Sequence, residues 1–395
     1  MAQVLPFLAT PILTRLFTEE DFATYTSFFA VASIFAVGVS GKYHLAIVLP
    51  EKEVDAKKIF WLSIYLTVAY ALLLVLLLPL FQSYFSNHVK TVLYYVPLHV
   101  LFFGIWSAYI SLSIRHKTFK INAFAKVLQS IGYIGTAVCL GLTKIFLYGL
   151  VLAKLAGTMF SFIFLAQKAN LNHELISPKR LGKVARTYID YPKYGIWPAF
   201  LNTISLQALV LVLNRFYNTE DLGHYGLTFM VLSAPLGLIG TSYKDVFYQR
   251  IAVLVNSKSY IDTMSFFKKS ALALLVMGIP ICLVLYFFGP ALFSFIFGNQ
   301  WGRSGEFASI LSLSFLVKLV VSPLSSIFNA TNTLKIASKW QALYFLSTFT
   351  TLGICSYVLE LDIEDLLLVY VIHECILYGL YLLLQYRTLK SFKGK

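Results

Sequence analysis

The chain has 395 residues, of which 58% are hydrophobic and only 13% are charged, and its mean hydropathy is +0.74. A water-soluble fold of this size cannot hide so much apolar surface in its core, which excludes a soluble enzyme. Lys and Arg outnumber Asp and Glu by 32 to 18, for a formal charge of +14. In a membrane protein this excess is expected in the cytoplasmic loops, so no nucleic acid is needed to explain it.

Twelve apolar runs read as membrane-crossing helices, since one crossing takes about 20 residues. They are residues 1–14, 22–41, 59–81, 91–114, 121–141, 145–167, 194–213, 222–241, 270–297, 305–328, 336–358 and 366–386. A β-barrel strand would alternate, whereas 72–80 is apolar throughout apart from Pro79. The sequence therefore predicts an all-α integral membrane protein. Only 14 residues precede Arg15, so either the first helix is short or the start of the chain is mis-set.

The basic residues predict the orientation in the membrane. With the N-terminus in the cytoplasm, 24 Lys and Arg lie in inside loops and tails, five in outside loops and three within the apolar runs. Because Lys and Arg favour the cytoplasmic side, both termini are expected to be cytoplasmic. The longest hydrophilic stretch is 168–193, so no separate soluble domain is expected.

An internal repeat appears when the chain is shifted by 200 positions. Nine positions match over residues 13–43, namely Leu13, Arg15, Glu20, Asp21, Tyr25, Phe29, Val31, Ser33 and Tyr43 with their counterparts. A weaker echo pairs Lys126 with Lys339. The repeat predicts an N-terminal lobe of helices 1–6 at 1–167 and a basic cytoplasmic linker at 168–193. The C-terminal lobe of helices 7–12, with a cytoplasmic tail, follows at 194–395.

The number of helices in each lobe sets the relation between the lobes. Because the number is even, both lobes enter the membrane in the same direction, and the repeat is parallel. Two matched lobes with the substrate between them are typical of an alternating-access transporter. The alternative is a duplicated helix bundle that transports nothing.

Two segments carry a family resemblance, PILTRLFTEEDF at 11–22 and GKYHLAIVLP at 41–50. They closely resemble the first two helices of bacterial polysaccharide flippases, the O-antigen and capsule repeat-unit translocases of the multidrug/oligosaccharidyl-lipid/polysaccharide exporter superfamily. The resemblance implies a MATE-like fold in the bacterial inner membrane. It also implies movement of undecaprenyl-pyrophosphate-linked oligosaccharide from the cytoplasmic to the periplasmic leaflet. Family members usually have a fuller first helix with a basic lead-in, and this chain departs from that pattern.

Such a cargo carries two or three negative charges on its pyrophosphate. A cavity with fixed cations would replace the hydration that these charges lose. Lys154 in helix 6 and Lys318 in helix 10 lie about ten residues from either end of their runs, too deep to snorkel easily. We expect both to bind the cargo, with a structural salt bridge as the alternative. Lys126, nearer the start of helix 5, either binds cargo or snorkels to the headgroups.

Three further basic residues are candidates for binding the cargo. Arg15 and Arg215 occupy equivalent positions at the outer ends of helices 1 and 7, and an arginine fork can hold a phosphate at two points. The alternative is a structural contact with the acids that follow each of them. Lys42 lies at the cytoplasmic end of helix 2, where it either recruits the headgroup or anchors the helix by the positive-inside rule.

Glu374 is the only acid deep within a predicted span, next to His373. It either carries a proton in the transport cycle or pairs with a lysine or hydroxyl on another helix. We therefore expect no cofactor and no metal, with proton or sodium coupling at these two residues. The four cysteines form no CxxC or Cys/His cluster and read as small buried hydrophobes.

Other functions stay open at this point. A multidrug extruder of the same superfamily would favour intramembrane acids, whereas here three lysines face one glutamate. A peptidoglycan-lipid flippase typically has helices beyond twelve. A membrane-embedded polymerase or glycosyltransferase would need catalytic motifs, and no GxGxxG, Walker A, HExxH or GxSxG occurs, so we expect no catalytic residues and no enzyme. A scaffold for polysaccharide assembly is the last alternative. For a flippase, the resemblance adds a polysaccharide polymerase and a chain-length regulator as partners.

Overall fold

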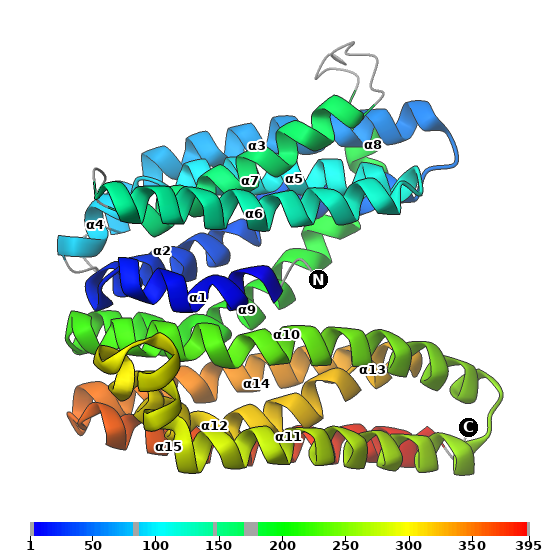
Figure 1. Cartoon of the computed structure of the whole chain (residues 1–395). Coiled ribbons are helices and arrows are strands. Elements are labelled where there is room, and N and C mark those ends of the chain that lie inside the picture. The colour runs from blue at the N-terminus through cyan, green and yellow to red at the C-terminus, as the bar shows by residue number, and fades with distance from the viewer. Residues whose placement is uncertain (1–3, 82–86, 145–147, 170–180, 393–395) are drawn as a thin grey trace. The chain divides into compact units, whose positions relative to one another are not determined.

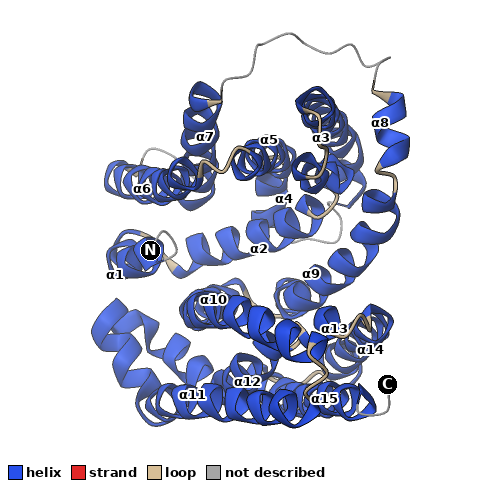
Figure 2. Cartoon of the chain, turned by 90° about the vertical axis from the view of Figure 1, so that its right-hand side faces the viewer, coloured by secondary structure: helices blue, strands red, loops and turns tan. Residues whose placement is uncertain are grey.

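The structure, a computed structural model, describes residues 4–81, 87–144, 148–169 and 181–392. In these ranges the chain forms helices joined by short connections, and no strand occurs (Figure 1). Figure 2 shows the same helices from a second direction, with loops only at their ends. The prediction of an all-α chain is confirmed.

The first part of the chain contains short and long helices. They are α1 (Val4–Leu16), α2 (Glu19–Ala36), the 3-10 segment η1 (Val39–Val48), α3 (Glu53–Phe81), α4 (Asn87–Leu93), α5 (Val96–Arg115), α6 (Phe119–Thr143), α7 (Gly149–Lys168), α8 (Gly182–Thr187) and α9 (Asp190–Phe216). α3, α5, α6 and α7 run alongside one another, with α5 in contact with the other three (Figure 1). A cluster of buried aliphatic and aromatic side chains from α2, η1, α3, α4, α5 and α7 forms a core of this part.

The second part of the chain follows the same plan. Its elements are α10 (Thr219–Asn256), α11 (Tyr260–Phe297), η4 (Asn299–Trp301), α12 (Gly302–Leu324), α13 (Ile327–Ala330), α14 (Leu334–Gly353), the π-helical η5 (Ile354–Val358) and α15 (Ile363–Phe392). α12 packs between α11 and α15, and α14 packs on α15. Within the described ranges, each of the twelve predicted runs overlaps one of the helices α1, α2, α3, α5, α6, α7, α9, α10, α11, α12, α14 and α15.

The helices differ in whether their length and composition let them cross a membrane. Within the described ranges, nine helices are long and apolar enough to cross, or ten when α2 and η1 count as one bent span. Helix α1 is apolar but shorter than the others. The protein is thus a multi-pass membrane protein, and the number of twelve crossings stays a prediction.

By its contacts the chain divides into two compact units, Met1–Gly223 and His224–Lys395. The repeat instead placed a linker at 168–193, of which 170–180 lies outside the described residues. The contact division falls later because α9 packs on α2, where the amide nitrogen of Asn214 donates to Ser27 Oγ at 2.7 Å. The contact division groups residues that pack together, whereas the repeat groups residues that correspond in sequence. The lobe boundaries predicted from the repeat therefore stay predictions.

The repeat is visible in how two helices begin. α1 and α9 end, and α2 and α10 begin, at positions 200 residues apart. The α2 start has a capping box, in which the Asp21 amide donates to Thr18 Oγ1 and the Thr18 amide donates to the Asp21 carboxylate. At α10, the Asp221 amide donates to Asn218 Oδ1 and the Asn218 amide group donates to Asp221. The repeated aspartate is therefore explained by helix capping.

The repeat continues into the bodies of these helices. Tyr25 stacks on Phe29 with ring centroids 6.1 Å apart, and Tyr225 stacks on Phe229 at the same 6.1 Å. Matching hydroxyls one turn further on, in α2 and α10, donate to the carbonyl three residues before them. The two segments thus share local geometry as well as sequence.

The run predicted as one helix at 22–41 is broken after Ala36, so that prediction was wrong for its last five residues. α2 ends at Ala36, and η1 departs from it at 61°. At the break, a Cβ on Gly38 would lie 2.9 Å from Tyr70 Oη of α3, so the close approach of α3 requires glycine here. The apolar run gave no sign of the break because Tyr70 lies far away in the sequence.

Helices α11 and α12 approach most closely where two glycines face each other. A Cβ on Gly289 would lie 2.5 Å from the carbonyl oxygen of Gly305. A Cβ on Gly305 would lie 2.6 Å from Pro290 Cα and against the Gly289 carbonyl. Small residues at such a crossing let two membrane helices pack backbone to backbone.

We predict that Gly305→Ala lowers the stability of the protein by about 1–3 kcal/mol, since the backbone of α11 cannot yield to an added methyl. Gly379→Ala in α15 is the matched control, because nothing lies within 4 Å of its Cβ position. Thermal unfolding of both variants in detergent measures the difference. Equal melting temperatures for the two variants would contradict the packing argument.

Candidate functional site

The deepest acid, Glu374 of α15, lies in a polar cluster inside the second unit, and its side chain is 0% exposed. Its Oε2 is 2.7 Å from Nζ of Lys318 on α12. Its Oε1 accepts a hydrogen bond of 2.8 Å from the Tyr344 hydroxyl on α14. Lys318 and Glu374 were predicted separately from the sequence, and here they contact each other. For Lys318 this contact is the salt bridge given as the alternative to cargo binding. For Glu374 it is the lysine partner, with a hydroxyl beside it, given as the alternative to proton transfer. Binding of cargo by Lys318 stays a prediction.

Aromatic side chains complete the surroundings of Lys318. Its ammonium donates to the Tyr370 hydroxyl at 3.2 Å and lies 5.2 Å from the centre of that ring. The ring of Tyr378 lies 5.9 Å away on the same helix, α15. His373 Nδ1 is 4.0 Å from Glu374 Oε1, at the edge of the cluster. Carboxylate, phenol oxygen and ring faces together replace the water that a buried ammonium loses.

Lys154 in the first unit has a different environment. It lies in the second turn of α7, so it is nearer the helix start than the sequence predicted. Its ammonium is 5.4 Å from the centre of the Phe29 ring of α2. Within the described part of the chain, no carboxylate lies within 4.0 Å of it. Lys154 is therefore a half-buried ammonium whose charge the described residues do not balance.

The structure places the other predicted cations on the surfaces of their helices. Lys126 of α6 has an exposed side chain. Arg15 is exposed and donates to the Pro11 carbonyl of its own helix at 2.6 Å. Arg215 is exposed as well. Among the described residues neither arginine forms an ion pair with the acids that follow it, since the aspartates cap helices instead.

Lys42 lies in a strained turn in η1. Three consecutive residues here have left-handed backbone, with φ of 52° at Ser40, 53° at Gly41 and 64° at Lys42. This conformation is unfavourable for residues other than glycine and persists only where the surroundings hold it. Ser40 Oγ is 2.6 Å from His44 Nδ1, and the hydroxyl of the residue after Lys42 donates to a carbonyl of α8 at 2.9 Å. The turn is thus held from two sides.

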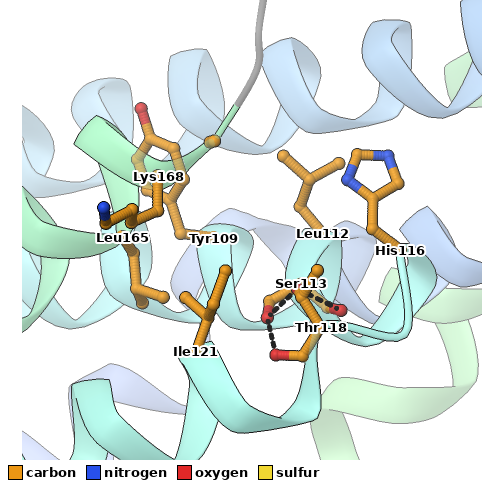
Figure 3. Close-up of a pocket in the computed structure, with 9 residues that line it drawn as sticks. Tyr109, Leu112, Ser113, His116, Thr118, Ile121, Leu165 and Lys168 are labelled. Atoms are coloured by element: carbon orange, nitrogen blue, oxygen red, sulfur yellow. Dashed lines mark hydrogen bonds between the residues drawn. The ribbon is translucent and has the colours of Figure 1, made fainter.

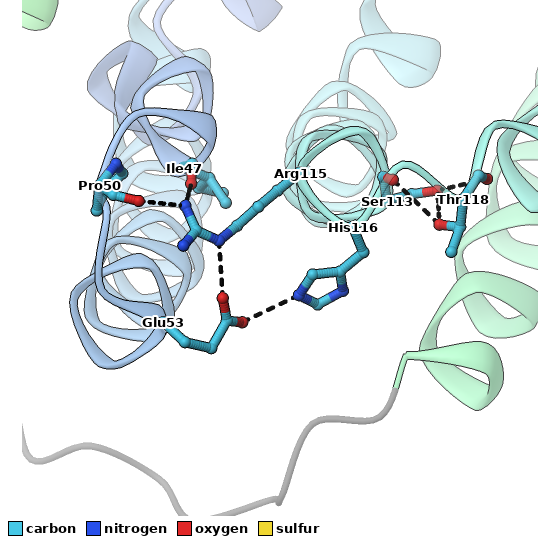
Figure 4. Close-up of polar contacts among 7 residues, drawn as sticks. All are labelled: Ile47, Pro50, Glu53, Ser113, Arg115, His116 and Thr118. Carbon is cyan, nitrogen blue, oxygen red and sulfur yellow. Dashed lines mark hydrogen bonds and ion pairs between the residues drawn. The ribbon is translucent and has the colours of Figure 1, made fainter.

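A clamp of polar contacts follows the same turn (Figure 4). Arg115, the last residue of α5, donates to Glu53 Oε2 at 2.8 Å and to the carbonyls of Pro50 and Ile47 at 2.7 and 3.3 Å. His116 Nε2 lies 2.9 Å from the other oxygen of Glu53. The clamp joins the end of α5 to the start of α3 and to the end of η1, so it fixes where the Lys42 turn sits.

A small pocket opens beside this clamp, at the ends of α5, α6 and α7 (Figure 3). In its wall Ser113 Oγ and Thr118 Oγ1 are 2.7 Å apart. No residue of the predicted site contributes to its lining, which is Tyr109, Leu112, Ser113, His116, Thr118, Ile121, Leu165, Lys168 and Ala169. Over the described ranges, no three His, Cys, Asp or Glu side chains gather as a metal site would require.

The sequence reading missed the tyrosines around Glu374. Tyr370 and Tyr378 lie four residues before and after it, so all three share one face of α15. That spacing was readable from the sequence. Tyr344 had no such signal, because it comes from another helix and contacts Glu374 only through folding.

Solved structures with this fold are membrane transporters. An inward-facing multidrug resistance MATE family transporter of the MOP superfamily matches with a TM-score of 0.76 at 14% identity, over 100% of this chain and 96% of that one. Lipid II flippase MurJ in an inward closed conformation matches with a TM-score of 0.75 at 15% identity, over 99% and 88%. A MOP superfamily transporter from Pyrococcus furiosus matches at 0.64 and 14%, over 99% and 93%. The MATE-like fold is confirmed.

The sequence itself matches the model of a family described as polysaccharide biosynthesis protein over residues 12–306. The chain belongs to this family, which confirms the resemblance seen in its first 50 residues. No curated protein matches the sequence.

We predict that Glu374→Gln destabilises the protein by about 3 kcal/mol, because it leaves the Lys318 ammonium without its countercharge. The double variant Lys318→Met/Glu374→Met removes both charges and should recover most of that loss. Thermal unfolding in detergent and the amount of protein in membranes report the effect. If the double variant is no more stable than the single one, the pair does not act as a compensated unit.

Proposed function

We propose that the protein is a flippase for undecaprenyl-pyrophosphate-linked oligosaccharide, the repeat unit of O-antigen or capsular polysaccharide. It moves this cargo from the cytoplasmic to the periplasmic leaflet of the bacterial inner membrane, by alternating access through a cationic central cavity, with both termini in the cytoplasm. Membership of a polysaccharide biosynthesis family and the fold shared with MOP superfamily transporters support the proposal. A polysaccharide polymerase and a chain-length regulator are its expected partners.

The observation that carries the proposal is the unbalanced charge of Lys154. An ammonium in an apolar helix is costly unless an anion compensates it. Among the described residues no carboxylate does so. A pyrophosphate in transit needs a cation to compensate its negative charge. A charge-assisted hydrogen bond between the Lys154 ammonium and the pyrophosphate is stronger than a hydrogen bond between neutral groups. Lys154 is therefore the residue we assign to the headgroup, ahead of the exposed Lys126, Arg15 and Arg215.

The charges also bear on the competing transporters. The deep acid Glu374 is already paired with Lys318, so it offers little to a cationic drug. This favours an anionic cargo over multidrug extrusion. The likeness to MurJ makes a peptidoglycan precursor the second candidate, since lipid II carries the same pyrophosphate chemistry and the two TM-scores, 0.76 and 0.75, do not discriminate. Transport without catalysis accounts for the site under either cargo.

We further propose that ion coupling, by protons or sodium, takes place at Glu374 with His373 beside it. The carboxylate is fully buried and held by one lysine and one tyrosine. A proton or sodium ion that competes with Lys318 for the Glu374 carboxylate would switch this group between two stable arrangements, one paired with Lys318 and one with the ion. Such a two-state element is what coupling requires.

We predict that Lys154→Ala reduces flipping of undecaprenyl-pyrophosphate-linked oligosaccharide in proteoliposomes at least ~10-fold, as expected for loss of a charged hydrogen bond. Lys335→Ala, at an exposed position in the first turn of α14, is the control. Surface polysaccharide in cells and the amount of protein in membranes are measured in parallel. Wild-type flipping by Lys154→Ala would refute the assignment of Lys154.

We predict that Glu374→Gln makes flipping insensitive to an imposed proton gradient, because glutamine cannot exchange a proton. The rate is compared with wild type at equal amounts of folded protein, with proton and sodium gradients applied separately. Loss of the sodium response alone would assign sodium as the coupling ion. A wild-type response to both gradients would exclude Glu374 from coupling.

A further inference from the structure

The pocket beside the Arg115 clamp lies where three candidate membrane spans of the first unit meet. The spans Val89–Arg115 and Gly149–Lys168 end at this pocket, and the span Phe119–Thr143 begins at it. A helix that crosses the hydrocarbon core ends at the level of the lipid headgroups. The pocket is therefore expected at headgroup level, on the side that the basic residues predict to be cytoplasmic.

The lining of the pocket combines aliphatic and basic side chains. Leu112, Ile121 and Leu165 supply the aliphatic part, and Figure 3 shows Lys168 and His116 on opposite sides of the pocket. The volume is about 310 Å³, with the space that is open to the outside included. This volume suits a small headgroup and is too small for a lipid-linked oligosaccharide.

The positive charge around this pocket has little compensation from the protein. Lys117, Lys120 and Lys168 are exposed, and within the described ranges none of them has a carboxylate within 4.0 Å. Glu53 lies 2.9 Å from His116, but its other oxygen is already held by the clamp. A cluster of basic side chains at headgroup level attracts anions of the membrane surface.

The surface next to these lysines is apolar. Ile114, Phe119 and Phe124, at the end of α5 and the start of α6, are 39%, 61% and 54% exposed. In a protein that crosses a membrane, exposed side chains of this kind face the acyl chains of lipids. A free phosphate would use the lysines alone, whereas a phospholipid would use both the lysines and this apolar surface.

We propose that this pocket binds the headgroup phosphate of an anionic phospholipid from the surrounding leaflet. Lys168 in the lining contacts the phosphate, and the neighbouring Lys117 and Lys120 add to the attraction. A lipid bound here contacts the ends of α5, α6 and α7 together. The inference goes beyond the proposed function, because this lipid belongs to the membrane and is no part of the cargo.

The backbone offers a variant that removes charge without adding strain. Lys117 has φ of 56°, in the left-handed region that favours glycine, so Lys117→Gly removes an ammonium and relaxes the turn. Lys144→Gly is its matched control, because Lys144 has φ of 49° at the opposite end of α6. Lys168→Gln is compared with Lys390→Gln, since both lysines lie in the last turn of a long helix.

Binding is measured by photo-crosslinking on the full chain in phosphatidylcholine nanodiscs. The probe is phosphatidylglycerol with a photoreactive group beside its phosphate, and the same group on phosphatidylcholine gives the zwitterionic control probe. We expect the phosphatidylglycerol probe to label peptides from 109–121 and 165–169. Lys117→Gly and Lys168→Gln should each lower this labelling about 5-fold, as expected for one basic residue near an anionic headgroup, and the two controls should not.

Added competitors identify the source of the phosphate. Unlabelled phosphatidylglycerol is expected to suppress the labelling, and inorganic phosphate is expected to leave it unchanged. Suppression by inorganic phosphate, equal labelling by the phosphatidylcholine probe, unchanged labelling of the two variants, or an equal loss in the two controls would overturn the inference. Melting temperatures show that each variant folds. Flipping by Lys154→Ala tests the proposed function separately, so either can fail without the other.

Discussion

Compensation of charge inside apolar helices is the constraint on which the candidate site depends. An ammonium that leaves water needs a countercharge, a hydrogen-bond acceptor or an aromatic face. Lys318 has all three, from Glu374, Tyr370 and Tyr378. Lys154 has only an aromatic face among the described residues. One lysine is therefore paired within the structure, and the charge of the other is balanced by no carboxylate among the described residues.

The repeated parts of the chain are the ones that hold helices in place. Both halves keep the aspartate that caps the second helix and the tyrosine–phenylalanine stack that follows it. Glycine contacts and the Arg115 clamp then fix where neighbouring helices cross. Because these features set the relative positions of helices within a unit, they decide which polar side chains can meet.

The sequence was sufficient for features that depend on composition and spacing along the chain. Each apolar run overlaps a helix of the described ranges, and the offset of 200 found the repeat, since both signals are local or periodic. The break after Ala36 could not be read, because it depends on Tyr70 of another helix filling the space at Gly38. The pairing of Lys318 with Glu374 was equally out of reach. Both charges were found, but only the packing of α12 on α15 brings them together.

Under the proposed function, the unequal charge compensation of Lys154 and Lys318 fits a lipid-linked cargo. Its headgroup has one pyrophosphate, so one uncompensated ammonium suffices to hold it. A second free ammonium would impose its own desolvation cost in every state in which no anion reaches it. Pairing Lys318 with a carboxylate removes that cost for the second half. In the first half no described carboxylate balances Lys154, and under the proposed function the headgroup of the cargo would offset that cost. Unequal charge on a shared framework is thus the arrangement expected of a duplicated transporter with a single anionic headgroup to move.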